Sequence, residues 1–368
     1  MREELYRIVK DWKDKPLVVV IDGLDEADRH FPPPFPTPLP QNVFVIASAR
    51  ASEGEKPEYL SGWIKDIEPI HLDRLPPCAI GNWLQKTGKG ELVTLAQDET
   101  FVTQVCDRTE GIPLFLKYLI DELLEVAQQG EESAIRKTLA ATPKGFPEYI
   151  RQQYQALNRL EDWRYRLDMR KIFYFLTIAK GELSSYDLVE LMGESPVGLP
   201  WQVSRWFKIR QLEDCLVFSF AHSTLAEQFA VLPKIQANTK NSHQELIKYC
   251  AQWEKYQSPY ALRHYAEHLR DVKQWEELYA MARNEDFYSH SIKQFPDEPD
   301  LPLKTVQTAL LAAAEEDKAG EMAEFMLLHA RQLLQTTAQD SPLDALRKGS
   351  LERAWRLTNL YEIERRIL

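Results

Sequence analysis

The chain has 368 residues, of which 44% are hydrophobic and 27% are charged, and its formal net charge at pH 7 is −11. This length predicts two or three domains, and the acidic balance argues against nucleic acid as a partner. No stretch approaches the roughly 20 apolar residues that span a bilayer, no signal-peptide pattern opens the chain, and the four cysteines lack metal or disulfide spacing, so we expect a cytoplasmic protein without a membrane partner.

The first predicted elements are a helix at residues 2–14 and a strand at 17–21, whose β-branched run is typical of a strand buried on both faces of a parallel sheet. Asp22, Asp25 and Glu26 follow at the carboxyl end of this strand, where open α/β sheets bind ligands. Asp22 could hold Mg²⁺ directly or through water, and Asp25 or Glu26 could orient an attacking water. The alternative is a polar turn that only ends the strand.

A proline-rich stretch, residues 31–40, cannot be helical. We interpret it as a stiff loop, with a motif for a proline-binding groove as the alternative. A second strand is expected at 42–48 and a third at 67–72. Arg50 follows the second strand, where an arginine could bind phosphate bidentately or could simply be solvated at the start of a loop.

Helices are expected at 77–86, 97–108 and 112–129. Gly111 breaks the second of these helices, and Pro113 suits the first turn of the third. A further helix is expected at 144–160.

Residues 162–232 predict a winged-helix domain, with helices at 164–179, about 185–192 and about 200–208, a strand at 216–222 and a short helix at 223–230. Arg205, Lys208 and Arg210 would give the third helix a modest positive charge. From about 240 onward the chain is expected to form paired helices, with hairpins beginning at 258 and others at about 302–316, 320–337 and 341–356, as in an α-solenoid.

The motifs resemble, in order, those of the STAND class of P-loop NTPases, particularly its NACHT branch. Ile21-Asp22-Gly23-Leu24-Asp25-Glu26 resembles the Walker B motif, Ser48-Ala49-Arg50 the strand end with its phosphate-sensing arginine, Gly111-Ile112-Pro113 the lid motif, and Phe220-Ala221-His222 the winged-helix histidine motif. The resemblance implies a mainly α chain with a partial NTPase core of α/β type at 1–75, a helical lid at 76–143, a winged-helix domain at 144–235 and TPR-like helical repeats at 236–368.

The resemblance also implies roles for single residues. Asp22 would serve Mg²⁺ through water, Asp25 and Glu26 would activate the attacking water, and Arg50 would sense the γ-phosphate. Pro113 would pack on adenine, and His222 would touch the β-phosphate in a closed, ADP-bound state. Helix capping alone would explain Gly111 and Pro113, and a structural role is the alternative for His222.

The sequence contains no Gly-x-x-x-x-Gly-Lys-Ser/Thr phosphate-binding loop. We therefore expect a fragment of a longer gene, one part of a split NTPase, or a degenerate family member. The uncapped ending at Ile367-Leu368 favours the fragment.

The functional hypothesis is an incomplete nucleotide-controlled switch that binds ATP or ADP with Mg²⁺ when complete and has no ATPase activity on its own. The alternative is a non-catalytic interaction module with a vestigial NTPase half and no nucleotide. Either function implies protein partners or self-association.

Overall fold

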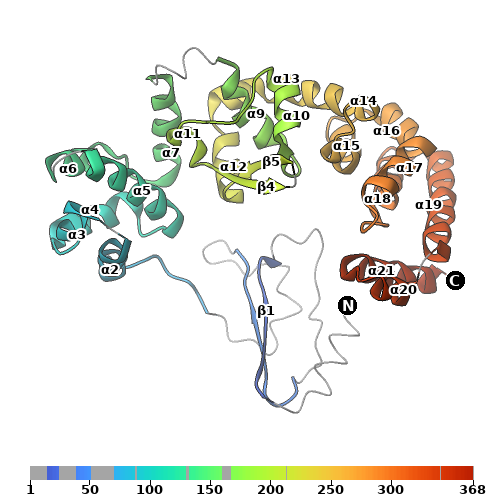
Figure 1. Ribbon diagram of the computed structural model, residues 1–368, viewed down its shortest axis with the longest axis horizontal. Coiled ribbons are helices and arrows are strands. Elements are labelled where there is room, and N and C mark those ends of the chain that lie inside the picture. Colours follow the sequence, from blue (N-terminus) through green and yellow to red (C-terminus); the bar gives the residue numbers. More distant parts are fainter. Residues whose placement is uncertain are drawn as a thin grey trace. The chain divides into compact units, whose positions relative to one another are not determined.

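The computed structural model describes residues 15–24, 39–50, 70–87, 89–129, 132–159, 167–212, 214–339 and 341–367. The described chain is mainly helical, as expected (Figure 1). It divides into two compact units, residues 1–73 and 74–368. The predicted helix at 2–14, most of the proline-rich stretch, Asp25 and Glu26 lie outside the described residues.

The first unit contains two parallel strands, β1 (Leu17–Ile21) and β2 (Val43–Ala47). They pair in register from Leu17 opposite Val43 to Ile21 opposite Ala47. Leu24 and Val43 are the buried centre of a small core, against which alternate residues of both strands pack. The parallel pairing agrees with the parallel sheet that the sequence predicts for the first strand.

The prediction that the first strand is buried on both faces is wrong for the described residues. Val18 is 53% exposed and Val20 66%, and beside them on β2 Phe44 is 56% and Ile46 58% exposed. Side chains alternate between the faces of a strand, and the described residues cover only one of these two faces.

Of the third predicted strand, residues 67–72, only 70–72 belong to the described residues, and the prediction is wrong for these three. They have no regular secondary structure. Ile70 and Leu72 are 84% and 94% exposed, so their apolar side chains do not pack in a sheet.

The second unit begins with a helical group formed by α2 (Pro77–Thr87), α3 (Glu91–Leu95), α4 (Glu99–Thr109), α5 (Pro113–Gln129) and α6 (Glu132–Ala141). Helices α2, α4 and α5 confirm the three predicted here. The sequence analysis missed α3 and α6, although α6 buries Ile135 and Leu139.

A second group follows α7 (Phe146–Ala156) and the 3₁₀ turns η4 (Leu157–Arg159) and η5 (Leu167–Arg170). Its elements are α9 (Lys171–Ile178), β3 (Leu183–Ser184), α10 (Ser185–Met192), α11 (Trp201–Ser204), β4 (Phe207–Leu212), β5 (Cys215–Phe220) and α12 (Ser223–Ala230). The three strands form an antiparallel sheet in the order β3-β5-β4.

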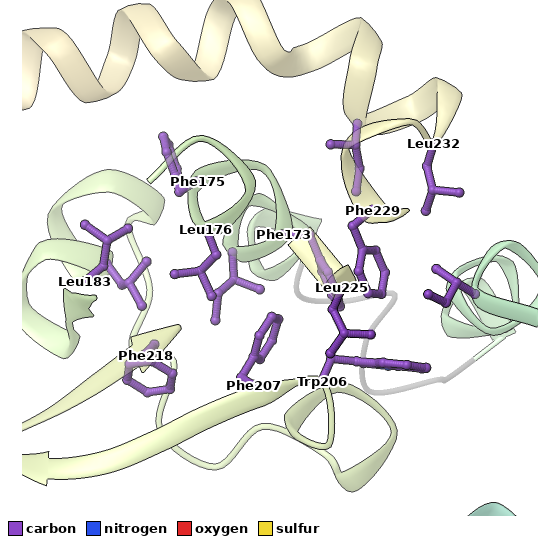
Figure 2. Packing of buried hydrophobic residues seen from close by; sticks show 14 of the residues in the cluster. Phe173, Phe175, Leu176, Leu183, Trp206, Phe207, Phe218, Leu225, Phe229 and Leu232 are labelled. Carbon is purple, nitrogen blue, oxygen red and sulfur yellow. The ribbon is translucent and has the colours of Figure 1, made fainter. Parts of the chain in front are cut away.

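Buried side chains from this sheet and its helices meet in one core (Figure 2). The labelled members are Phe173, Phe175, Leu176, Leu183, Trp206, Phe207, Phe218, Leu225, Phe229 and Leu232. Several rings are in direct contact, such as Phe173 with Phe229, whose centroids are 4.9 Å apart.

One expectation for this group is wrong. The third helix was predicted to reach residue 208, but α11 ends at Ser204 and residues 207–212 form β4. The alternation of Phe207, Ile209 and polar neighbours has the two-residue period of a strand, and this period prevails over the helical extension.

The rest of the chain consists of α13 (Pro233–Cys250), α14 (Trp253–Tyr256), α15 (Pro259–Asp271), α16 (Trp275–Ala282), α17 (Glu285–Gln294), α18 (Leu301–Glu315), α19 (Ala319–Gln339), α20 (Pro342–Arg347) and α21 (Leu351–Ile367). Neighbouring helices pack in pairs, including α15 with α16, α18 with α19 and α20 with α21. The hairpin expected at 341–356 corresponds to α20 and the start of α21, which Gly349 separates with a left-handed φ of 84°. The hairpins expected at 302–316 and 320–337 are wrong, because each range is a single helix, α18 and α19.

Candidate functional site

The carboxyl ends of β1 and β2 are joined by Ser48. Its hydroxyl donates a hydrogen bond to the Asp22 carboxylate, and the Gly23 N–H donates to the Ser48 hydroxyl oxygen at 3.0 Å. The Leu24 N–H donates to the Ser48 carbonyl at 2.9 Å. Gly23 has φ of 72°, a left-handed conformation that suits glycine. This turn holds Asp22 beside Ser48.

Asp22 and Ser48 are both exposed, so an acidic and a hydroxyl oxygen are available at the strand ends. Oxygen ligands of this type suit Mg²⁺, which keeps several waters. Arg50 lies two residues beyond Ser48 and is also exposed. Its guanidinium adds to this edge a positive charge that suits phosphate oxygens.

Pro113 is the first residue of α5 and is exposed. The turn before it is tightly built, because Glu110 and Gly111 both adopt left-handed conformations, with φ of 52° and 68°. A Cβ added to Gly111 would lie 2.6 Å from the Leu75 carbonyl oxygen. The Leu75 N–H also donates to the Gly111 carbonyl at 2.8 Å. The Gly-x-Pro sequence therefore fixes how α5 starts against residues 74–75.

His222 is the N-cap of α12. Its Nδ1 accepts a hydrogen bond from the Thr224 N–H at 3.1 Å. A nitrogen that accepts carries no proton, so the proton of the neutral ring is on Nε2. His222 is exposed, and its Nε2–H is thus a donor of the type that an anion accepts.

The structure brings together Asp22 and Ser48, with Arg50 close in sequence. Pro113 and His222 belong to the other compact unit, at the start of α5 and of α12. Each of the two therefore has a described local role in starting a helix.

The basic residues expected on the third helix do not form a positive face. Arg205 is buried, with its side chain 4% exposed, and its guanidinium lies over the Trp206 ring at 4.5 Å. Lys208 and Arg210 are on β4, where Arg210 pairs with Glu182. The burial of Arg205 and the pairing of Arg210 argue further against nucleic-acid binding through this helix.

Sequence reasoning missed two polar clusters. Asp187 is 2% exposed and accepts hydrogen bonds from the side chains of Ser184, Tyr249 and Ser258, which connects α10, α13 and α15. The other cluster contains His243 and His268. The Ser184-to-Asp187 spacing is a recognisable capping box, whereas the partners from distant helices leave no local signal.

No protein-family model matches the chain, and no curated protein matches it. Within the described ranges, no helix combines the length and apolar character needed to cross a membrane.

Proposed function

We propose that the chain is part of a NACHT-like STAND switch, in which the edge formed by Asp22 and Ser48 takes the magnesium-bound phosphates of ATP or ADP. One observation carries the proposal. The two strands pair in parallel with the register that sets Asp22 beside Ser48, and the Ser48 hydroxyl holds the Asp22 carboxylate. Arg50 would sense the terminal phosphate, and Asp25 or Glu26 would orient water.

The order of elements in the second unit supports the same proposal. The sequence α9-β3-α10-α11-β4-β5 has the helix and strand order of a winged helix, and the antiparallel sheet order is compatible with that fold. Helices α2–α6 would be the lid that carries Pro113 on adenine. Paired helices from α15 onward would form the TPR-like repeats. His222 would donate to the β-phosphate in the closed state.

The chain has no phosphate-binding loop of the Gly-x-x-x-x-Gly-Lys type. We therefore propose that it does not hydrolyse ATP alone, that its strand ends bind nucleotide weakly, and that a complementary polypeptide supplies the remaining phosphate contacts. The exposed face of β1 and β2 supports this, because parallel sheets usually have both faces covered.

The test is equilibrium binding of MgATP and MgADP to the purified 368-residue chain. We expect binding that Asp22→Asn weakens by about tenfold, equivalent to ~1.4 kcal/mol, and that Ser48→Ala also weakens. Asp107→Asn is the matched control, since Asp107 is an exposed carboxylate on α4. The proposal fails if nucleotide does not bind, or if Asp22→Asn and Asp107→Asn bind it equally.

A second candidate, a non-catalytic interaction module, is favoured by exposed leucines on α19. Leu327 is 73% and Leu334 50% exposed. They are seven residues apart and so share a helix face. If this face mediates self-association, light scattering will show a dimer that Leu327→Asp converts to a monomer. A monomeric parent chain contradicts this alternative.

A further inference from the structure

Two histidines and a carboxylate meet where α13 packs against α15. His243 comes from α13, while His268 and Asp271 lie three residues apart in the last turn of α15. One ring nitrogen of each histidine and one Asp271 oxygen all lie within 4.8 Å of one another. Residues three apart on a helix share a face, so both α15 ligands are presented to His243.

The ring of His268 is fixed through both of its nitrogens. The Lys180 N–H donates to the Tyr260 hydroxyl oxygen at 3.1 Å, and that hydroxyl is 2.6 Å from His268 Nε2. Tyr260 can therefore donate its own proton to Nε2. His268 Nδ1 then carries the ring proton and donates to His243 Nε2, 2.9 Å away.

Burial and, to a smaller extent, the charges of His243, Lys180 and His264 lower the pKa of His268 to about 3. The ring is thus neutral in the folded protein at physiological pH. A neutral imidazole is the form that binds metal ions.

We propose that His243, His268 and Asp271 form a binding site for a divalent transition-metal ion, and that Zn²⁺ is the ion that suits these ligands best. Two imidazoles and one carboxylate, with a fourth position left to water, are a recurrent zinc ligand set. In the bound state the His268 proton would move to Nε2 and be donated to Tyr260. Orientation of a ligating histidine by a hydrogen bond from its other nitrogen is typical of metal sites.

The distances show which part of the site is preformed. With zinc–nitrogen bonds of about 2.0–2.1 Å, two tetrahedral ligands lie roughly 3.3 Å apart. The two histidine nitrogens are 2.9 Å apart and need only a small adjustment. Asp271 is exposed, and one of its oxygens lies within 4.8 Å of a ring nitrogen of each histidine.

The Asp271 carboxylate of this cluster is already paired with a lysine side chain. Lys180 Nζ lies 2.6 Å from Asp271 Oδ2, and the carboxyl end of α15 also favours positive charge. Lys180 must release Asp271 before the carboxylate can bind a metal. We infer that the lysine competes with the metal ion and sets its affinity.

The experiment is calorimetric titration of Zn²⁺ alone into the chelator-treated full chain. We expect one ion per chain, with affinity at least tenfold lower in His243→Gln and in Asp271→Asn. Lys180→Gln is expected to bind severalfold more tightly. His329→Gln is the matched control because His329 is a half-buried histidine with one side-chain hydrogen bond, to Gln307. Its affinity should equal that of the parent.

Thermal unfolding gives a second readout, since a ligand that binds only the folded state raises Tm. Zn²⁺ should raise the Tm of the parent and of His329→Gln. The increase in Asp271→Asn should be much smaller. Asp271 is exposed, so this variant keeps the test valid even if His243→Gln does not fold. No zinc binding, or equal binding by His243→Gln and His329→Gln, would overturn the proposal. Neither result depends on nucleotide binding.

Discussion

Arg205 shows most clearly how burial changes the role of a residue. In the sequence it adds positive charge to the predicted third helix of the winged-helix domain. In the structure its guanidinium donates to the Tyr149 hydroxyl at 2.6 Å, and Tyr149 donates to the Glu122 carboxylate at 2.6 Å. Through these contacts Arg205 connects α5 and α7 to the end of α11. The local sequence could not reveal Glu122, which is 83 positions earlier in the chain.

Replacing Arg205 tests this role. Arg205→Ala should lower the free energy of unfolding by about 3 kcal/mol, because it leaves the buried Tyr149 hydroxyl and the half-buried Glu122 carboxylate without their cation. Arg210→Ala removes an arginine whose side chain is 54% exposed, so the loss should stay within about 1 kcal/mol. Urea unfolding measures both values, and equal losses would contradict the assigned role.

At the scale of the element, local patterns predict helices well and turns only in part. The apolar periodicity and capping residues of α5, α12 and α15 predict these helices to within about two residues. The sequence also predicts that Gly111 separates α4 from α5. It cannot show that Leu75 lies against this glycine, because that contact depends on how residues 74–75 pack.

Substitutions at two glycines separate the cost of the Leu75 contact from the cost of the left-handed backbone conformation. Gly111 and Gly193 both have a left-handed φ, but an added Cβ would meet the Leu75 backbone at Gly111 and no atom within 4 Å at Gly193. Gly193→Ala should therefore cost about 1 kcal/mol from strain alone, and Gly111→Ala about 1–3 kcal/mol more. Thermal or urea unfolding of the two variants gives the difference. If the two losses are equal, the Leu75 contact is not important.

β4 shows how two local patterns can compete. Apolar and polar residues alternate from Phe207 to Arg210 in a way that fits a strand, yet these residues follow a short helix and the sequence also predicts that this helix continues. Pairing with β5 from Phe207 to Leu212 decides the outcome, because alternate residues of this edge strand gain inter-strand hydrogen bonds. The first strand was misjudged for a related reason, since its apolar run does not show whether both faces are covered.

At the scale of the whole molecule, the sequence predicts the strands that precede Asp22 and Arg50, but not the contact between Asp22 and Ser48. Asp22 and Ser48 meet because each follows a strand and the two strands are parallel. The cluster of His243 with His268 depends instead on how two helices pack, and 25 positions separate its members. Helix pairing was expected, but not the rotation of each helix that brings these rings together.

The central claim is that the strand ends bind a nucleotide through its magnesium ion, and the dependence of ADP binding on Mg²⁺ tests it most directly. ADP would be titrated into the parent chain and into Asp22→Asn, each with Mg²⁺ and with a chelator. We predict that the parent loses at least about tenfold in affinity without Mg²⁺, whereas Asp22→Asn binds weakly and equally under both conditions. Binding by the parent that is the same with and without Mg²⁺, or a variant that keeps the full Mg²⁺ effect, would contradict the claim.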